Sequence, residues 1–248
     1  MYDFQDKYAV VTGAAKGIGR AIAERFVKEG VKGLAILDYD EELAKKTSAE
    51  LDESGSVVVA LKCNVADYDE VQRVFAELNE KWGRIDILVN NAGITKDKMF
   101  HKMSYDQMHD VMNVNFFGVY NCCAAVINGM RDRCYGKIVN ISSTSAYGNI
   151  GQVNYAASKG AINGFTRSLA KESGRKNITV NAVLPGGVDT EMMRAIPEEK
   201  YQANLAAHPM GRLGSVDEIA NLVMFLSSDE SSYVSGECII TSGSWIIH

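Results

Sequence analysis

Short apolar runs alternate with longer segments of helical periodicity along the 248 residues of the chain. The runs have the length of buried strands, and the segments between them repeat apolar residues every three or four positions, as one face of a helix requires. Strands separated by helices are joined by right-handed crossovers, which builds a parallel sheet covered on both faces. The pattern therefore predicts one α/β domain with a doubly wound parallel sheet in three layers. The expected strands are residues 7–12, 33–38, 57–61, 85–90, 137–143, 178–184 and 238–241, and the expected helices are residues 20–29, 41–54, 67–82, 104–131, 153–173 and 215–227, with a further helix ending near residue 208.

Composition excludes several classes of partner and site. The net charge of -5 gives no basic surface for nucleic acid. Five cysteines without metal-ligand spacing, and in odd number, argue against a disulfide framework and for reduced thiols. The four histidines show no ligand spacing either, so we expect no metal. The start of the chain has no apolar signal region, and no run approaches the ~18 to 20 apolar residues of a membrane span. We expect a soluble, cytoplasmic protein.

A glycine-rich turn follows the first expected strand, with Gly13, Gly17 and Gly19 leading into a helix. Glycine permits backbone conformations that a Cβ forbids and lets the backbone approach a pyrophosphate closely. The helix N-terminus adds free N–H groups and a positive dipole. Strand, turn and helix together predict a binding site for a dinucleotide.

Asp38 ends the second expected strand, 25 positions beyond Gly13. A carboxylate there can accept both ribose hydroxyls of NAD and repel the 2′-phosphate of NADP. Lys16, in the turn, could contact that phosphate, but an unpaired carboxylate against a phosphate is the harder clash to relieve. The sequence therefore favours NAD(H), with NADP(H) as the second choice. The alternative role for Asp38 is the N-cap of the helix that begins at Glu41.

Polar and glycine-containing segments follow three later strands, at residues 90–93, 142–143 and 185–190. Ligands of such sheets bind at the carboxyl ends of the strands. In the first segment, small residues would let a cofactor approach the backbone while asparagine side chains hold the turn. We expect these segments to lie together around one site.

Tyr155 and Lys159 lie four positions apart in the expected helix 153–173, so the phenol and the ammonium can converge. A nearby cation lowers the pKa of a phenol from its usual value of about 10. The pair could therefore act as a proton shuttle. The alternative is an amphipathic helix with a solvated lysine.

Together these motifs resemble the short-chain dehydrogenase/reductase family, from about Lys7 to about Gly243. The resemblance implies a Rossmann fold and the nicotinamide-dependent interconversion of a ketone and a secondary alcohol. The matching residues are Thr12 and the glycines after it, Asn90, Asn91, Ala92, Gly93, Asn115, Ser142, Ser143, Tyr155, Lys159, Pro185, Gly186 and Thr190.

The resemblance also implies roles for single residues. Tyr155 would protonate the carbonyl oxygen as hydride arrives, and act as base in the reverse direction. Lys159 would lower the pKa of Tyr155 and hold the nicotinamide ribose, and Asn115 would hold a water that links Lys159 to solvent. A serine hydroxyl would bind the substrate oxygen. Besides Tyr155 and Lys159, the implied cofactor-binding residues are Gly13, Lys16, Gly17, Ile18, Gly19, Asp38, Asn64, Val65, Asn91, Ala92, Gly93, Pro185, Gly186, Val188 and Thr190.

The catalytic serine departs from the family pattern by one position. The family's serine usually precedes the tyrosine by 13 residues, which here is Ser142, whereas Ser143 precedes it by 12 but holds the usual place at the strand end. We favour Ser143, because strand register fixes which side chain faces the cleft and a loop absorbs a missing residue more easily. Ser142 takes the role if the register slips by one.

Asn64 stands where the family commonly has an aspartate that accepts a hydrogen bond from the adenine amino group. The amide oxygen of asparagine can also accept, so we expect weaker selection for adenine. The alternative is a turn residue at the end of a strand.

Segments 94–103, 149–155 and 209–214 look most like the 3-oxoacyl-thioester reductases, which act on carrier-protein or coenzyme A thioesters. Most of these enzymes use NADPH, whereas Asp38 indicates an NADH-linked variant. The alternatives are a hydroxysteroid, polyol or other secondary-alcohol dehydrogenase and, more distantly, a catalytically silent regulator. Four cations at helix ends could contact an anionic thioester carrier at the cleft rim, or simply complement helix dipoles: Arg131, Arg133, Arg175 and Lys176.

Two surfaces remain without a partner in the predicted fold. Met192 and Met193 lie in segment 190–209, where the family has a mobile substrate segment, and could line an acyl pocket. A helix packed permanently on the core would show the same pattern.

The expected helices 104–131 and 153–173 carry more apolar residues than one buried stripe requires. The family uses these helices for association, so we expect a homotetramer.

Overall fold

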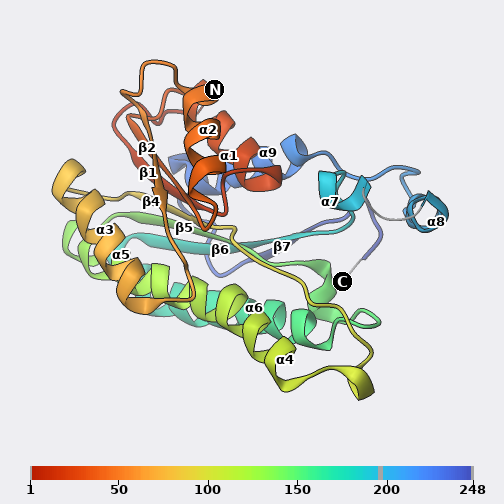
Figure 1. Cartoon of the computed structure of the whole chain (residues 1–248). Coiled ribbons are helices and arrows are strands. Elements are labelled where there is room, and N and C mark those ends of the chain that lie inside the picture. The colour runs from red at the N-terminus through yellow and green to blue at the C-terminus, as the bar shows by residue number, and fades with distance from the viewer. Residues whose placement is uncertain (1, 195–197, 247–248) are drawn as a thin grey trace.

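The computed structural model describes residues 2–194 and 198–246. Its described strands form one parallel sheet in the order β3-β2-β1-β4-β5-β6-β7 (Figure 1). The predicted doubly wound α/β fold is confirmed. The strands are β1 (Tyr8–Thr12), β2 (Gly33–Asp38), β3 (Val58–Lys62), β4 (Ile87–Asn90), β5 (Gly136–Ile141), β6 (Ile178–Pro185) and β7 (Cys238–Thr241).

Helices cover both faces of the sheet and make two apolar cores. Figure 1 shows α1 (Gly17–Lys28), α2 (Glu41–Leu51) and α9 (Val216–Ser227) on one face. The other face carries α3 (Tyr68–Trp82), α4 (Tyr105–Met112), α5 (Gly118–Arg133) and α6 (Val153–Ser173). Alternate strand residues enter the two cores: Val11 and Val89 face α1 and α9, while Val10 and Leu88 face α3 and α5. Coverage of both faces explains why the strands read as continuous apolar runs.

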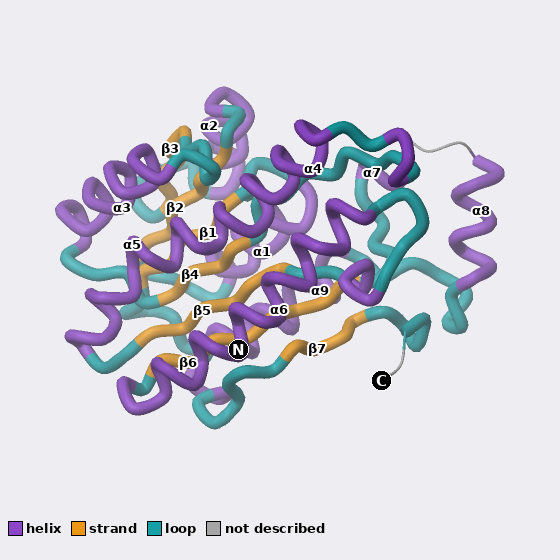
Figure 2. Tube along the Cα trace, turned by 90° about the horizontal axis from the view of Figure 1, so that it is seen from below, coloured by secondary structure: helices purple, strands orange, loops and turns teal. Residues whose placement is uncertain are grey.

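The strand order reverses at β1, because the chain builds β2 and β3 on one side of it and then crosses to β4 on the other. Such a switch point opens a crevice between the carboxyl ends of the two neighbouring strands. We call this side of the sheet the carboxyl edge and the opposite side the amino edge. Two shorter helices, α7 (Glu191–Arg194) and α8 (Glu198–Ala207), lie beyond the carboxyl edge (Figure 2).

The predicted helix 104–131 is interrupted. Between α4 and α5 the chain makes a π-helical turn over Asn113–Phe117. Asn115 lies in this turn, and its side chain bonds the backbone of Ile94 in both directions, at 2.8 Å and 3.1 Å. Gly118 follows, and a Cβ there would lie 2.7 Å from Val65 Cγ2. The wider turn aims Asn115 inward, and π-turns are frequent at functional sites.

One stretch corrects the expectation that no segment has the composition of a membrane span. Residues Tyr105–Arg133 form a helical stretch of 29 residues, which is long enough to span a membrane. A window of 18 residues within it reaches a mean hydropathy of 1.2, and 44% of that window is buried. Cys122, Cys123, Val126 and Met130 pack from α5 into the core between helices and sheet. The stretch therefore packs as a core helix of the fold.

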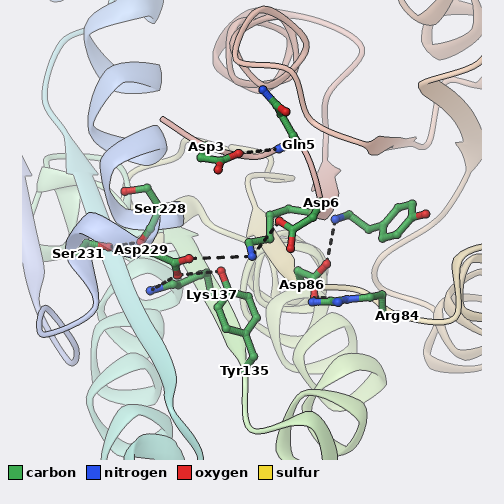
Figure 3. A network of polar contacts seen from close by, with 12 residues as sticks. Asp3, Gln5, Asp6, Arg84, Asp86, Tyr135, Lys137, Ser228, Asp229 and Ser231 are labelled. Atoms are coloured by element: carbon green, nitrogen blue, oxygen red, sulfur yellow. Dashed lines mark hydrogen bonds and ion pairs between the residues drawn. The ribbon is translucent and has the colours of Figure 1, made fainter. Parts of the chain in front are cut away.

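A network of charged side chains lies at the amino edge (Figure 3). Lys137, buried in β5, lies 3.7 Å from an oxygen of Asp229, which also accepts a 2.9 Å hydrogen bond from Tyr135 Oη. Asp86, fully buried before β4, accepts from Arg84 Nε at 2.7 Å and from the Tyr8 amide at 3.0 Å. Each buried charge at this edge has a partner of opposite sign.

Candidate active site

Glycines shape the turn after β1 for two different reasons. Gly13 and Gly17 have φ values of +61° and +59°, where a side chain would be strained. A Cβ on Gly13 would lie 2.8 Å from Ala92 Cα, and one on Gly19 would collide with Gly13 O. No atom lies within 4 Å of a Cβ built on Gly17. Packing therefore requires Gly13 and Gly19, whereas Gly17 faces open space in which a ligand fits.

The first turn of α1 is left without a side-chain cap. Lys16 is the N-cap residue, and its exposed side chain makes no capping hydrogen bond. The turn contains no acidic residue, and Ile18 is half-buried in it. Uncapped N–H groups and the helix dipole favour an anion at this position. The predicted residues of the glycine-rich turn thus fit the pyrophosphate of a dinucleotide.

Asp38 fixes the neighbouring backbone. One carboxylate oxygen accepts from the Ala15 amide at 3.0 Å and the other from the Asp40 amide at 3.1 Å. Asp40, by contrast, accepts from Leu43 N and is the N-cap of α2. The alternative that Asp38 caps this helix is therefore wrong. The carboxylate is held at the carboxyl end of β2 beside the glycine-rich turn.

Thr12 and Asn91 join the carboxyl ends of β1 and β4. Asn91 Nδ2 donates to the carbonyls of Thr12 and Gly13, at 3.0 Å and 2.8 Å. Thr12 Oγ1 in turn accepts from the amides of Asn91 and Ala92, at 3.0 Å and 3.1 Å. These four bonds fix the carboxyl ends of β1 and β4 relative to each other. The sequence pointed to Asn91, while the part of Thr12 was missed.

Asn64 and Val65 lie at the carboxyl end of β3. Asn64 Oδ1 accepts from the Ala66 amide at 3.2 Å, which is the bonding of a turn residue. Val65 is buried, and its carbonyl accepts from Asn121 Nδ2 at 2.9 Å. The structure therefore gives Asn64 the turn contact that was its alternative role.

The side chains of Tyr155 and Ser143 lie near each other. Burial raises the pKa of Tyr155, the interaction with Ser143 lowers it, and the charge of Asp97 raises it, with a net upward shift. Ser142 is 2% exposed, and its hydroxyl donates to the Lys159 carbonyl at 3.0 Å. Of the two serines, Ser143 is the one brought to Tyr155, while Ser142 binds the backbone of α6.

Lys159 is buried, and no carboxylate in the described part of the chain forms an ion pair with it. Its Nζ donates to the Ile141 carbonyl at 2.7 Å and lies 5.5 Å from the centre of the Tyr155 ring. Burial lowers the pKa of Lys159 to about 8. The pKa of Tyr155 was expected to fall beside this lysine. It is raised instead, because desolvation of the phenol outweighs the interactions that lower it.

Gly93 lies beside both Asn115 and Lys159. A Cβ on Gly93 would lie 3.3 Å from Asn115 Oδ1 and 3.6 Å from Lys159 Nζ. Asn115 Nδ2 also donates to Ser158 Oγ at 3.0 Å, and Ser158 Oγ donates to the Tyr155 carbonyl at 2.7 Å. The π-helical turn and the N-terminal part of α6 are thus joined through Ser158, a second residue that the sequence reasoning missed.

The segment after β6 completes the carboxyl edge. The Pro185 carbonyl accepts from Thr144 Oγ1 at 3.2 Å, and Gly186 N donates to the Thr241 carbonyl at 2.9 Å. Val188 forms a parallel bridge with Gly214, and Thr190 Oγ1 accepts from Met193 N at 3.3 Å. The predicted residues from six strand ends therefore lie along one edge of the sheet. Among the described residues, no group of three or more His, Cys, Asp or Glu side chains is placed to hold a metal ion.

Comparison with known proteins agrees with this geometry. Residues 13–243 match the sequence profile of a family described as enoyl-(acyl carrier protein) reductase. The chain is 44% identical to an acetoacetyl-CoA reductase of Shinella zoogloeoides, over 96% of this chain and 97% of the relative. It is 40% identical to a 3-oxoacyl-[acyl-carrier-protein] reductase of Vibrio harveyi, over 97% and 98%, and 41% identical to one of Thermotoga maritima, over 98% and 99%. The chain belongs to the short-chain dehydrogenase/reductase family. As a short-chain dehydrogenase/reductase it is an oxidoreductase that acts on CH–OH groups with a nicotinamide cofactor.

Within this short-chain dehydrogenase/reductase, the cations proposed for the cleft rim lie elsewhere. Helix α6 has 21 residues and is about 30 Å long, and Tyr155 lies near its start while Arg175 and Lys176 follow its end. Arg131 Nη1 donates to the Glu172 carbonyl at 3.4 Å, and Arg133 Nη2 donates to the Ile85 carbonyl at 2.6 Å. All four cations belong to the amino edge of their own chain, so the rim prediction is wrong within one chain. The Met192 side chain lies outside the described residues, and Met193 is half-buried.

Proposed function

We propose that the protein is an NAD(H)-dependent reductase of 3-oxoacyl thioesters, which converts the 3-ketone to the 3-hydroxyacyl thioester. The observation that carries this proposal is that Ser143 and Tyr155 lie together, with buried Lys159 beside them, at the carboxyl edge next to an uncapped glycine-rich turn. The names of the curated relatives support the thioester, because they are reductases of acetoacetyl-CoA or of 3-oxoacyl carrier-protein thioesters.

The bound nicotinamide supplies the hydride that reduces the ketone carbon. Tyr155 and Ser143 would hold the ketone oxygen between their hydroxyls, and Tyr155 would transfer its proton to that oxygen. The raised pKa of Tyr155 keeps the phenol protonated at neutral pH, as a general acid requires. The reaction consumes one ketone, one hydride and one proton and yields one alcohol.

Lys159 and Asn115 would return the proton to Tyr155. A lysine whose pKa is about 8 releases and regains a proton readily near neutral pH, unlike an ordinary lysine. Asn115 Oδ1 and Lys159 Nζ both lie beside Gly93, which supports a path from Lys159 along the π-helical turn. We assign Ser143 rather than Ser142 to the substrate, since the hydroxyl of Ser142 is bound to the α6 backbone.

Asp38 supports the preference for NAD(H). Its carboxylate is fixed by two amide donors at the end of β2, where a 2′-phosphate would meet a negative charge that cannot turn away. Lys16 is exposed at the start of α1 and free to follow the pyrophosphate instead. Most related thioester reductases use NADPH, so the proposed preference for NADH distinguishes this protein from most of its relatives.

We also propose a cytoplasmic homotetramer. The exposed face of α4, α5 and the π-helical turn between them supports association, because Tyr105, Phe117 and Tyr120 are 75%, 47% and 48% exposed there. Apolar area of this kind usually marks an interface. A monomer in sedimentation at micromolar concentration would contradict the tetramer.

The decisive experiment measures initial rates of acetoacetyl-CoA reduction with NADH and with NADPH in parallel, with Tyr155→Phe as the control. We expect turnover with NADH that the control abolishes. Tight NADH binding without thioester turnover would keep the cofactor assignment and contradict the substrate, and steroids and polyols would then be tested as alcohols. A preference for NADPH would contradict the role given to Asp38.

A further inference from the structure

Three segments far apart in the sequence meet behind the turn that follows β6. They are residues 185–188, 208–214 and 241–246. Gly186 N donates to the Thr241 carbonyl and Gly214 N to the Gly187 carbonyl, both at 2.9 Å. The segment 185–188, which carries three of the predicted cofactor residues, is therefore held from two sides by later parts of the chain.

Two aromatic rings pack directly on the glycine backbone of this turn. His208 is 4% exposed, and its ring lies 4.8 Å from that of Trp245, with 31° between the planes. A Cβ on Gly187 would lie 2.6 Å from His208 Nε2, and one on Gly186 would lie 3.5 Å from Trp245 Cε3. Side-chain positions at residues 186 and 187 are thus already occupied. Trp245 and Ser242 fill the first, and His208 and Leu213 fill the second.

The segment that carries Trp245 is itself fixed. Ser242 Oγ accepts from the Ile246 amide at 3.1 Å, and the Trp245 amide donates to the Ser242 carbonyl at 3.1 Å. A Cβ on Gly186 would also lie 2.8 Å from Ser242 Cβ. Any shift of this segment would therefore move the turn after β6.

We propose that His208 and Trp245 are positioning residues, whose packed rings fix the Gly186 and Gly187 backbone and so set the affinity for the nicotinamide half of the cofactor. The inference rests on the proposed function, which places Pro185, Gly186, Val188 and Thr190 at that half. The adenine half would be held separately, by the glycine-rich turn and Asp38. In this proposal the two rings act through the turn, without a contact of their own with the substrate or the cofactor.

The test compares the binding of NADH with that of ADP-ribose, which lacks the nicotinamide, in the wild type and in His208→Leu and Trp245→Leu. We expect the Kd of NADH to rise about tenfold, a change of 1.4 kcal/mol, while the Kd of ADP-ribose changes less than about twofold. His208→Phe and Trp245→Phe retain a ring for stacking and should restore most of the NADH affinity.

The chain offers a matched control at the amino edge. Trp82 stacks on Tyr8 at 5.1 Å and 22°, and a Cβ on Gly33 would lie 2.6 Å from the Tyr8 ring. Trp82→Leu removes the same kind of stack and should leave the ratio of the two Kd values unchanged.

Equal weakening of both ligands in the Trp245 and His208 variants, or no weakening, would overturn the inference. Variants that fail to fold, as followed by circular dichroism, would show that the pair is structural, and would overturn it too. If the wild type bound ADP-ribose and NADH equally well, the nicotinamide would contribute nothing to the affinity. The two rings would then have no nicotinamide contact to position, and the inference would be overturned. A wild type that binds neither ligand would instead refute the proposed function.

Discussion

Two lysines are buried in the described part of this protein, one at each edge of the sheet, and their surroundings differ. Lys137, at the amino edge, has the Asp229 carboxylate at 3.7 Å and the Tyr135 ring at 5.9 Å. Lys159, at the carboxyl edge, has a backbone carbonyl and no carboxylate. Burial lowers the pKa of both, but Asp229 opposes the shift only for Lys137. A carboxylate partner stabilises the charged form of a buried lysine, whereas a buried lysine without such a partner exchanges its proton more readily.

The largest expected effect separates the two lysines by activity. We expect Lys159→Met to lower kcat about 10³-fold, as the loss of a group in proton transfer does. Lys137→Met should leave kcat within about twofold, because the amino edge takes no part in the reaction. Initial rates of thioester reduction measure both variants. Equal losses in the two would show that the edges are not functionally distinct.

Two carboxylates extend the comparison from activity to stability. Asp86→Ala leaves Arg84 and the Tyr8 amide without their acceptor, and should lower the free energy of unfolding by about 3 kcal/mol. Asp38→Ala also frees two backbone amides, but at the half-buried carboxyl edge, and should cost about 1 kcal/mol. Urea denaturation gives both values. Only the Asp38 variant should change the ratio of kcat/KM for NADH to that for NADPH.

Adjacent serines test the comparison within one strand end. Ser143→Ala should lower kcat about 10²-fold, since a donor to the reacting oxygen is lost. Ser142→Ala should lower the free energy of unfolding by about 1 kcal/mol and leave kcat nearly unchanged, because its hydroxyl bonds only the α6 backbone. Loss of turnover in the Ser142 variant alone would reverse the assignment.

The smallest effect is a dependence of stability on pH. The pKa of Lys159 is about 8 in the folded protein against 10.5 ordinarily, so between these values the unfolded chain binds more protons and stability rises with pH. The wild type should therefore gain about 1 kcal/mol relative to Lys159→Met between pH 8 and 9. The difference between wild type and Lys137→Met should rise less steeply, because Asp229 opposes the shift. Parallel slopes would contradict the role given to this counterion.

Sequence patterns predicted the sheet and most site positions, because strand ends and glycine turns have local signals. The bounds of α6 and β7 agree with the prediction at both ends. The carbonyl of Ile141, which binds Lys159, has no such signal, because every residue carries a carbonyl. The contact of Trp245 with Gly186 depends on folding across about 60 residues and was equally invisible.

Asp38 and Asp40 show a second limit of prediction from the sequence, because spacing could not tell which of the two caps α2. Both residues are acidic and precede α2, so spacing alone allowed either to cap it. Only the backbone path places Asp40 at the helix start and turns Asp38 toward Ala15. The sequence predicted a carboxylate at this strand end, but not which of the two neighbouring aspartates would cap α2.

The π-helical turn between α4 and α5 makes the length of this stretch more critical than its composition. A π-helical turn holds one residue more than an α-helical turn, so removing one residue from Asn113–Phe117 would let an ordinary helix run through with α4 and α5 in nearly the same relative rotation. Cys122, Val126 and Met130 would then stay in the core, while the wider turn that aims Asn115 inward would be lost. A single codon deletion there would thus remove a feature of the site and leave the packing of α5 in place.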